Sequence, residues 1–547
     1  MTSADPGAAV IPAPADRQAG AGRFLLGSTT VLSVAEPALL PVAERFRADL
    51  ATYTDVRLPD PVIETVVEPV IETVAAAASV HLAIGTPTGP TGATRATRAT
   101  RGLRADGAPV DVERHQLDVT AAGVRVLGST DEALHRGLTT LVHLAGVGDG
   151  TIRCGRIVDA PELAWRGLSL DVVRWFVPVA AVERVIDVLS FYKLNVLHLH
   201  LTDNEAWRLE IEGRSRLTEG NDGFYTQDEF RHLVDYARER FVTVVPEVDL
   251  PGHAAAVLAA YPELGVTVPA DSAVPLQVAY LDPGVEATWA YVDDVLGQLA
   301  ALSPAPFLHL GGDEAFGMDP TLYTQFVDRA IEVVRRVGKR VVGWQETCRA
   351  GVGPDEVVQH WIDFSALAGG DSAGAADGLA PEVLDLLVAH FGEALGDLDR
   401  IADKGARLLL SPTTTFYLDQ PHGDPSLDAA QEADRSRLGL AFYGGRTLEQ
   451  LLDWDLEAAA GAVPPERLVG VEAAAWCETV RSAEDLELLL LPRLAGVAEL
   501  GWNASARAPW SDHRGRLAAH APVWDRAGWS WFRAASVDWP EAEHPAG

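Results

Sequence analysis

Downstream of Ala160-Pro161, short runs of apolar residues alternate with longer stretches in which apolar residues recur every three or four positions. A short apolar run predicts a buried strand, and the longer spacing, as in Val182, Val185 and Leu189, predicts an amphipathic helix. The predicted strands are Gly167–Leu170, Val196–Leu201, Thr243–Pro246, Phe307–Leu310, Arg340–Gly343, Val357–Gln359, Arg407–Leu410 and Val469–Ala473. Eight strand-and-helix steps in one run predict an α/β protein with a (β/α)8 TIM barrel, in which ligands bind at the C-terminal ends of the strands.

The chain before this barrel has a different organisation. Residues 1–22 are rich in Ala, Pro and Gly and predict a disordered tail. Residues 23–160 predict a smaller α/β sandwich domain. Its expected strands lie near Phe24–Leu26, His81–Ile84 and Val124–Leu127, and its expected helices carry Leu39, Phe46 and Leu50, and Leu134, Leu138 and Leu141. Three copies of Ala-Thr-Arg over Ala93–Arg101 predict a polar surface loop. Residues 161–547 then form the barrel, which ends in a C-terminal helix from about Asp512.

Composition narrows the choice of partners and compartment. The 547-residue chain has a formal net charge of −34, which argues against nucleic acid and anionic membrane surfaces as partners. No stretch approaches the roughly 18 unbroken apolar residues of a membrane span. Three widely spaced cysteines match neither a disulfide framework nor a zinc site. The first 22 residues lack a basic start followed by an apolar core, so we expect a cytoplasmic protein, or a secreted one if the start is mis-assigned. The oligomeric state stays open.

Two adjacent acids end the fourth predicted barrel strand. After Phe307–Leu310 the chain continues Gly311-Gly312-Asp313-Glu314, and the glycines allow a sharp bend or a close approach to a ligand. Asp-Glu pairs also serve as caps at strand and helix ends, so this pair by itself does not establish catalysis. Its position at the C-terminal end of a barrel strand favours a catalytic pair.

Polar and aromatic residues follow the other predicted strands as well. They are Asp171, Arg174, His198, His200, Asp203, Glu247, Asp249, His253, His309, Trp344, Glu346, Trp361, Tyr417, Asp419, Trp476 and Glu478, with Arg166 just before the first strand. Carboxylates and arginine can bind vicinal hydroxyls while aromatic rings cover the apolar face of a sugar, so this set indicates a carbohydrate site. A metal site at His198, His200 and His253 is the alternative, but no short-spaced ligand motif supports it.

Several of these segments together resemble glycoside hydrolase family 20, the β-N-acetylhexosaminidases. The similar segments are Trp165-Arg-Gly-Leu-Ser-Leu-Asp171, Lys193-Leu-Asn195, His198-Leu-His200-Leu-Thr-Asp203, Pro246-Glu-Val-Asp-Leu-Pro-Gly-His253, His309-Leu-Gly-Gly-Asp-Glu314, Gly343-Trp-Gln-Glu346, Val358-Gln-His-Trp361, Tyr417-Leu-Asp419 and Trp476-Cys-Glu478. They span roughly residues 160–505 in the family's order. The N-terminal domain resembles the family's usual companion domain.

The resemblance implies a role for each matched residue. Glu314 would protonate the glycosidic oxygen, and Asp313 would hold the N–H of the sugar's 2-acetamido group while its carbonyl attacks C1. The implied substrate-binding residues are Arg166, Trp344, Trp361, Tyr417, Asp419, Trp476 and Glu478. Phe442 aligns where the family often has a further pocket tryptophan. The implied orienting residues behind the acids are His253, His309, Asp249, Glu247 and Asp203. The resemblance implies no metal and no organic cofactor.

These residues predict an exo-acting enzyme that removes terminal β-linked N-acetylglucosamine, or also N-acetylgalactosamine, from oligosaccharides or glycoconjugates. Two alternatives remain. A family member that releases a disaccharide would need an open subsite instead of a closed pocket. A non-catalytic carbohydrate-binding protein could keep the fold, although intact Asp313, Glu314 and Tyr417 speak against it.

Overall fold

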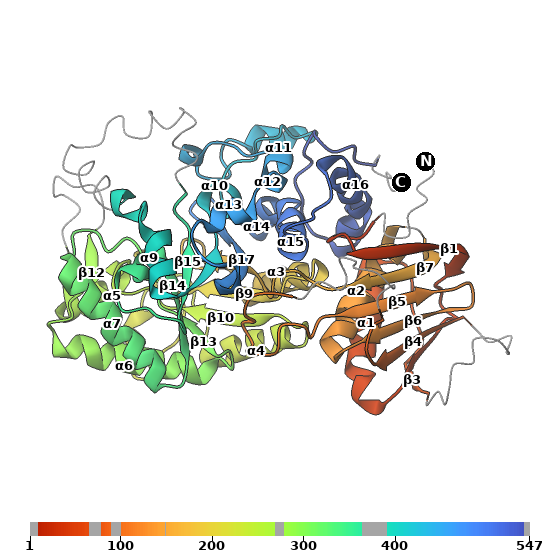
Figure 1. Ribbon diagram of the computed structural model, residues 1–547. Coiled ribbons are helices and arrows are strands. Elements are labelled where there is room, and N and C mark those ends of the chain that lie inside the picture. Colours follow the sequence, from red (N-terminus) through yellow and green to blue (C-terminus); the bar gives the residue numbers. More distant parts are fainter. Residues whose placement is uncertain are drawn as a thin grey trace.

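The computed structural model describes residues 9–64, 78–88, 100–147, 149–267, 278–363 and 391–540. Within these ranges the chain forms two domains that lie side by side, the N-terminal domain at the right of Figure 1 and a barrel at the left. The predicted architecture, a TIM barrel preceded by a smaller α/β domain, is confirmed. Most of the Ala-Thr-Arg repeat lies outside the described residues. No helix in the described ranges has the length and apolar character needed to cross a membrane.

The N-terminal domain is a seven-stranded mixed sheet in the order β1-β7-β5-β6-β4-β2-β3. Its strands are β1 (Asp16–Leu25), β2 (Val31–Val34), β3 (Val62–Ile63), β4 (Ser79–Ile84), β5 (His115–Val119), β6 (Gly123–Gly128) and β7 (Thr151–Asp159). Helices α1 (Leu40–Tyr53) and α2 (Asp131–Val147) pack on one face of this sheet. Alternating residues of β4 and β6, such as Val80, Leu82, Val124 and Val126, are buried beneath the helices, as a period of two requires.

The prediction of a disordered tail is wrong for residues 9–22. Val10 and Ile11 are fully buried, and the chain enters β1 at Asp16. The carbonyl of Ala9 accepts a hydrogen bond from His520 Nε2 at 2.6 Å. Composition misled here because contacts with the distant C-terminal helix, which no local pattern reveals, order this segment. Residues 1–8 lie outside the described ranges.

The barrel consists of eight parallel strands in the closed order β10-β13-β14-β15-β16-β17-β8-β9. Their bounds are β8 (Trp165–Asp171), β9 (Val196–His200), β10 (Thr243–Glu247), β13 (Phe307–His309), β14 (Arg340–Trp344), β15 (Val357–His360), β16 (Arg407–Leu410) and β17 (Leu468–Ala475). Every predicted barrel strand is present, because parallel strands covered on both faces appear in the sequence as nearly continuous apolar runs. A small antiparallel pair, β11 (Gly265–Thr267) and β12 (Ala279–Leu281), lies outside the barrel.

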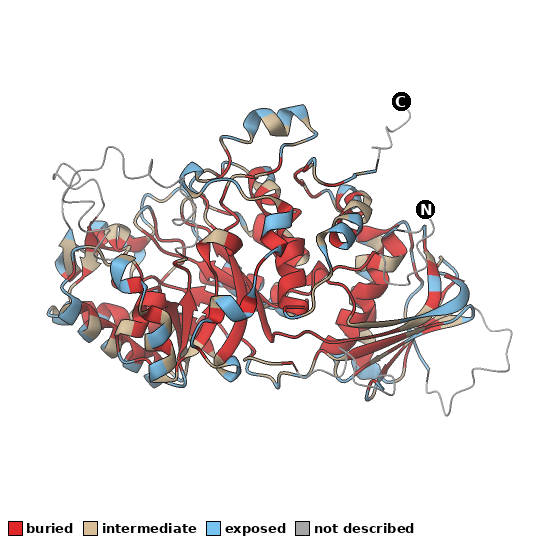
Figure 2. Ribbon diagram, turned by 45° about the horizontal axis from the view of Figure 1, so that its top comes forward, coloured by how far each residue is buried: buried red, intermediate tan, exposed pale blue. Residues whose placement is uncertain are grey.

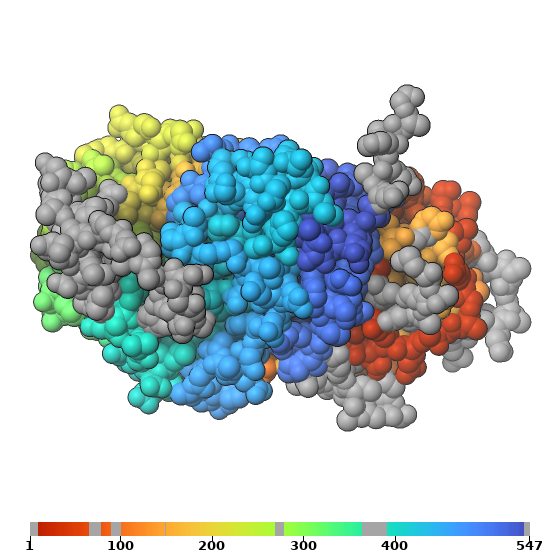
Figure 3. Space-filling model, turned by 90° about the horizontal axis from the view of Figure 1, so that it is seen from above, coloured from red at the N-terminus to blue at the C-terminus, as the bar shows by residue number. Residues whose placement is uncertain are grey.

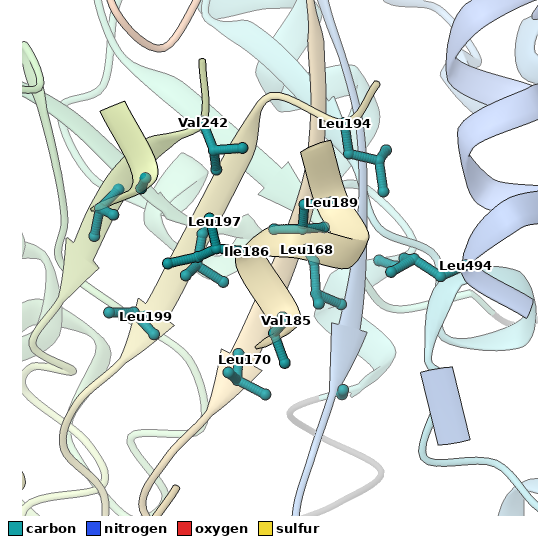
Figure 4. Packing of buried hydrophobic residues seen from close by; sticks show 14 of the residues in the cluster. Leu168, Leu170, Val185, Ile186, Leu189, Leu194, Leu197, Leu199, Val242 and Leu494 are labelled. Atoms are coloured by element: carbon teal, nitrogen blue, oxygen red, sulfur yellow. The ribbon is translucent and has the colours of Figure 1, made fainter. Parts of the chain in front are cut away.

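Helices surround these strands. They are α3 (Val179–Phe191), α4 (Gln227–Arg238), α5 (Ala255–Ala260), α6 (Glu286–Leu302), α7 (Pro320–Arg336), α9 (Asp397–Lys404), α10 (Thr413–Phe416), α11 (Ala429–Asp434), α12 (Leu448–Leu452), α13 (Leu456–Ala460), α14 (Ala483–Leu490), α15 (Arg493–Trp502) and α16 (Trp510–Ala527). Figure 4 shows how α3 uses its predicted apolar face, with Val185, Ile186 and Leu189 packed over Leu168 of β8 and Leu197 of β9. Buried residues are concentrated on the strands and on the inner sides of the helices (Figure 2).

The two domains share a large contact. Helix α16 packs against α1 and α2 and, seen from above, lies between the light-blue barrel surface and the red N-terminal domain (Figure 3). Leu103 and Ala105 pack with Trp165 and Phe307 at the N-terminal end of the barrel. A Cβ at Gly102, where φ is +108°, would lie 2.1 Å from the carbonyl oxygen of Val469. The N-terminal domain therefore closes the end of the barrel opposite to the predicted site.

Candidate active site

The acids Asp313 and Glu314 stand on a tight turn just beyond β13. Gly311 and Gly312 adopt positive φ values of 67° and 102°, a region that residues with a Cβ rarely occupy. A Cβ on Gly311 would lie 1.8 Å from Asp249 Oδ1. Glu314 itself has φ of 44°, and a non-glycine residue in this region stores roughly 1–3 kcal/mol of strain, as is common at functional sites.

Hydrogen bonds from three neighbouring segments hold this turn. Tyr323 Oη donates to the carbonyl of Gly312 at 2.6 Å, and the N–H of Gly312 donates to Asp249 Oδ1 at 3.0 Å. The backbone N–H of Trp344 donates to the carbonyl of Gly311 at 2.8 Å. These hydrogen bonds hold the turn in the conformation that places Glu314 at positive φ, and they fix the backbone from which both acids extend.

His253 faces both acids. Its Nε2 lies 3.6 Å from Asp313 Oδ2 and 3.7 Å from Glu314 Oε2, and its Nδ1 lies 2.9 Å from Asp203 Oδ1. Burial alone would lower the pKa of His253, but the carboxylates of Asp203, Asp249 and Asp313 raise it well above its ordinary value. An imidazolium ion therefore stands beside the acid pair, and Asp203 holds it in place.

The pKa of Asp249 is raised as well, which for a carboxylic acid favours the neutral form. Burial and the neighbouring Asp313 raise the pKa of Asp249 well above the ordinary value for an aspartic acid. Its Oδ1 accepts from Gly312, while Oδ2 has no hydrogen-bond partner within the described part of the chain. Asp249 therefore supports the turn through Oδ1, and its raised pKa means that the folded state resists a second negative charge behind Asp313.

Four aromatic residues lie together near the acids and form what we call the aromatic wall. Trp344 comes from β14, Trp361 follows β15, Tyr417 follows α10, and Trp476 follows β17. The rings of Trp361 and Tyr417 are stacked with centroids 6.3 Å apart, and Trp476 lies 5.9 Å from Trp344 and 6.0 Å from Tyr417. Trp344 Nε1 donates to Glu247 at 2.8 Å, and Trp361 Nε1 donates to Glu346 at 3.1 Å. Hydrogen bonds thus fix the orientation of both indoles.

Carboxylic acids and an arginine lie near the same aromatic rings. Asp419 is fully buried, and neither of its carboxylate oxygens has a hydrogen-bond partner among the described residues. Burial and the nearby Glu478 raise the pKa of Asp419 well above its ordinary value. Buried polar atoms normally have partners, so these oxygens are suited to bind ligand hydroxyls. The guanidinium of Arg174 lies over Trp476, 5.4 Å from the ring centroid. Acids, a guanidinium and aromatic rings therefore converge at the C-terminal ends of the strands, as a sugar site requires.

Comparison with known proteins agrees with this geometry. The family model "Glycosyl hydrolase family 20, catalytic domain" matches residues 163–319 and 386–505, and the model for domain 2 of the same family matches residues 8–160. A β-N-acetylhexosaminidase of Cellulomonas fimi is 37% identical over 451 residues, which cover 80% of this chain and 83% of that protein. The chain belongs to glycosyl hydrolase family 20. It is therefore a glycoside hydrolase of the β-N-acetylhexosaminidase family.

Solved structures of the family have the same overall fold. A mutant Streptomyces plicatus β-hexosaminidase in complex with its product GlcNAc has a TM-score of 0.77 and is 30% identical, with 98% of each chain covered. The family 20 β-N-acetylhexosaminidase of Streptomyces coelicolor A3(2) has a TM-score of 0.76 and 30% identity, covering 98% of this chain and 99% of that one.

The prediction that Arg166 binds substrate in this family 20 enzyme is wrong. Arg166 lies at the beginning of β8, the opposite end of the barrel from the acids, and is fully buried. Its Nη2 donates to Glu113 of the N-terminal domain at 2.6 Å and to the carbonyl of Lys193 at 2.9 Å. Arg174, three residues past the end of β8, occupies the pocket instead and lies 2.6 Å from Asp203. Arg166 therefore joins the two domains, and Arg174 is the arginine of the site.

The prediction for Phe442 also needs correction. Phe442 is 65% exposed and packs on Tyr443, with ring centroids 4.2 Å apart. Tyr443 turns inward, belongs to the same cluster as the aromatic wall, and lies 6.0 Å from Tyr417. Sequence position alone could not choose between neighbouring aromatics in a short 3-10 turn, Ala441–Tyr443, that has no strand period.

The remaining predicted residues behind the acids lie where the sequence placed them, although their roles stay predictions. Glu247, Asp249, Asp203, His253 and His309 are all at the C-terminal ends of the strands, within or next to the network that reaches the acids. Sequence reasoning also missed a structural carboxylate of the barrel interior, Glu472. This buried carboxylate on β17 accepts from Trp165 Nε1 at 2.8 Å and lies 2.9 Å from His198 Nδ1. A charged residue inside an apolar strand was the available signal.

Three groups in the described ranges have the residue types of a metal site. They are His198, Glu247 and His309; His200, Glu247 and Asp249; and Asp249, His253 and Asp313. Glu247 already accepts from His200 and Trp344, and Asp249 already accepts from the Gly312 N–H. Protein donors thus occupy both oxygens of Glu247 and one oxygen of Asp249, and the absence of a metal requirement stays a prediction.

Proposed function

We propose that this family 20 enzyme is an exo-acting β-N-acetylhexosaminidase that removes terminal β-linked N-acetylglucosamine by substrate-assisted catalysis. The observation that carries the proposal is the common position of the two acids. Asp313 and Glu314 both approach one imidazole nitrogen, His253 Nε2, within 4 Å, so they act on the same side of a bound sugar. Two-carboxylate retaining enzymes instead place one acid on each side of the anomeric carbon, which two adjacent residues on one turn are not suited to do.

The proposed reaction assigns each acid one task. Glu314 donates a proton to the glycosidic oxygen while the 2-acetamido carbonyl of the substrate attacks C1 and the C1–O bond breaks. Asp313 accepts a hydrogen bond from the acetamido N–H and balances the positive charge of the oxazolinium ion. Asp313 Oδ1 is buried and has no hydrogen-bond partner in the described ranges, which suits this task. Glu314 then takes a proton from a water molecule, and the water oxygen attacks C1 and opens the oxazolinium ring. The configuration at C1 is retained overall.

Holding the nucleophile on the substrate replaces a protein nucleophile by proximity. The aromatic wall of Trp344, Trp361 and Tyr417 would enclose the acetamido group, and Trp476 would cover the sugar ring. Asp419, Glu478 and Arg174 would bind the hydroxyls. No metal or organic cofactor takes part in the proposed steps.

Aryl glycosides test this proposal directly. The wild-type enzyme should hydrolyse the 4-nitrophenyl β-glycoside of N-acetylglucosamine, and the glucoside without the N-acetyl group should react at least about 1,000-fold more slowly. Equal rates on both would refute substrate assistance. Glu314→Gln should abolish hydrolysis of unactivated substrates, and Asp313→Asn should lower kcat more than it raises KM. The rate on the corresponding N-acetylgalactosaminide, which differs only in configuration at C4, measures the preference between the two sugars.

The same panel separates the other functions. Release of a chromophore only from a disaccharide glycoside would indicate a disaccharide-releasing enzyme. Binding of N-acetylglucosamine without turnover of any glycoside would indicate a carbohydrate-binding protein.

A further inference from the structure

Glu247 connects the aromatic wall with the network behind the acids. It is the last residue of β10 and is fully buried in the barrel interior. Its Oε1 accepts from Trp344 Nε1 at 2.8 Å, and its Oε2 lies 2.6 Å from His200 Nδ1. His309 Nδ1 also lies 3.0 Å from Oε1, and His198 Nε2 lies 3.0 Å from Oε2. The two shortest contacts are those with Trp344 of β14 and His200 of β9, one on each carboxylate oxygen.

His200 passes this contact on towards the acids. Its other nitrogen, Nε2, lies 3.0 Å from Asp203 Oδ2. A ring with a carboxylate at each nitrogen carries both protons, because each nitrogen then donates to an anion. Asp203 in turn holds His253, which faces Asp313 and Glu314. An unbroken series of charge-assisted contacts therefore leads from Glu247 to the acid pair.

We propose that Glu247 is a positioning residue that fixes Trp344 and His253 together, so that the wall of the pocket and the acid pair keep one relative geometry. This inference rests on the proposed function, because Trp344 is the residue expected to enclose the attacking acetamido group. Glu247 does not touch the substrate in this scheme. Its Oε1 holds Trp344, which would enclose the attacking acetamido group, and its Oε2 holds His200, which leads to the acid pair.

Glu472 provides a matched control in the same barrel. It is also a fully buried glutamate that accepts from a tryptophan, Trp165 Nε1 at 2.8 Å, and contacts a histidine, His198 Nδ1 at 2.9 Å. Trp165, however, packs with Phe307 and Leu103 at the closed end of the barrel, away from the acids. His198 links the two glutamates, because its other nitrogen, Nε2, lies 3.0 Å from Glu247 Oε2. Glu472→Gln therefore removes the same charge from similar surroundings one residue further from the acids, and it leaves the contacts of Glu247 with Trp344 and His200 in place.

The test compares the two variants on the aryl N-acetylglucosaminide. Glu247→Gln should lower kcat about 100-fold with KM within about threefold of wild type, because ground-state contacts with the sugar remain. Glu472→Gln should keep kcat within about threefold of wild type, whereas both variants should lose similar stability in urea. Glu247→Gln should also reduce the preference for the N-acetyl substrate over its N-propionyl analogue, since a loosened Trp344 admits the longer acyl group.

A second variant keeps the test decisive if Glu247→Gln does not fold. Trp344→Phe removes the indole donor but keeps an aromatic wall, and it should lower kcat and the N-acyl preference in the same direction. Where both variants fold, the double variant should be no slower than the slower single one, because they break the same contact.

The possible outcomes separate this inference from the proposed function. Wild-type enzyme that fails to hydrolyse the N-acetyl substrate defeats the proposed function itself. If the wild type is active and the folded Glu247→Gln enzyme has a near-normal kcat, only the proposed role of Glu247 is overturned. Equal losses in Glu247→Gln and Glu472→Gln would also overturn it, because a general effect on barrel packing would then explain both.

Discussion

The structure assigns Arg174, and not Arg166, to the active site. We therefore expect substitution of Arg174 to lower activity and substitution of Arg166 to lower stability. Arg174 lies within 2.6 Å of Asp203, within 3.1 Å of Glu205 and over the ring of Trp476 at the pocket. Losing charge-assisted hydrogen bonds to sugar hydroxyls should cost about 2–4 kcal/mol of transition-state stabilisation. Arg174→Gln should therefore lower kcat/KM roughly 30- to 700-fold.

Arg166→Gln should instead change stability. Its guanidinium donates to the buried Glu113 and to three backbone carbonyls, those of Leu163, Ala164 and Lys193, at the interface between the domains. Breaking a buried ion pair costs about 3–5 kcal/mol, and we expect about 3 kcal/mol because Glu113 keeps Arg104 and Arg136 as partners. The activity of the folded fraction should stay within about threefold of wild type.

Two measurements on each variant decide between these roles. Urea unfolding followed by circular dichroism gives the stability, and initial rates on an aryl N-acetylglucosaminide give kcat/KM at a temperature where both variants are folded. The reassignment would be refuted by a folded Arg166→Gln enzyme with a large loss of kcat/KM, or by an Arg174→Gln enzyme with normal kinetics. Arg174→Lys, which keeps the charge but loses the planar fork, should recover only part of the activity.

Three further perturbations test other parts of the structure. Because burial and Asp313 raise the pKa of Asp249, the folded state resists its ionisation and stability falls as pH rises. Asp249→Asn should thus lessen the decline of the urea midpoint as pH rises above about 4, the ordinary pKa of an unfolded aspartic acid, and an unchanged decline would contradict the shift. Tyr443→Ala should lower kcat/KM at least about tenfold, whereas Phe442→Ala should stay within about twofold; the reverse order would restore Phe442 to the pocket. Ile11→Ala should cost about 2–5 kcal/mol of stability, and a disordered segment would show no loss.

Local patterns were sufficient wherever one property of one segment decides the outcome. A strand covered on both sides must be apolar along its length, so all eight barrel strands could be recognised from their runs. A turn with positive φ at two positions needs glycine, so Gly311 and Gly312 marked the place where Asp313 and Glu314 leave the strand.

Contacts between distant segments decided the rest. Arg166 and Arg174 flank the same strand, and only the direction of that strand in the closed barrel separates the interface from the pocket. Val10 and Ile11 look like part of a flexible tail until helix α16, some five hundred residues later, supplies their partners. The pairing of Glu247 with Trp344 and His200 joins three strands. The sequence by itself thus determined the elements and the chemistry at their ends, while burial and long-range partners, which depend on how the whole chain closes, determined which of those residues meet.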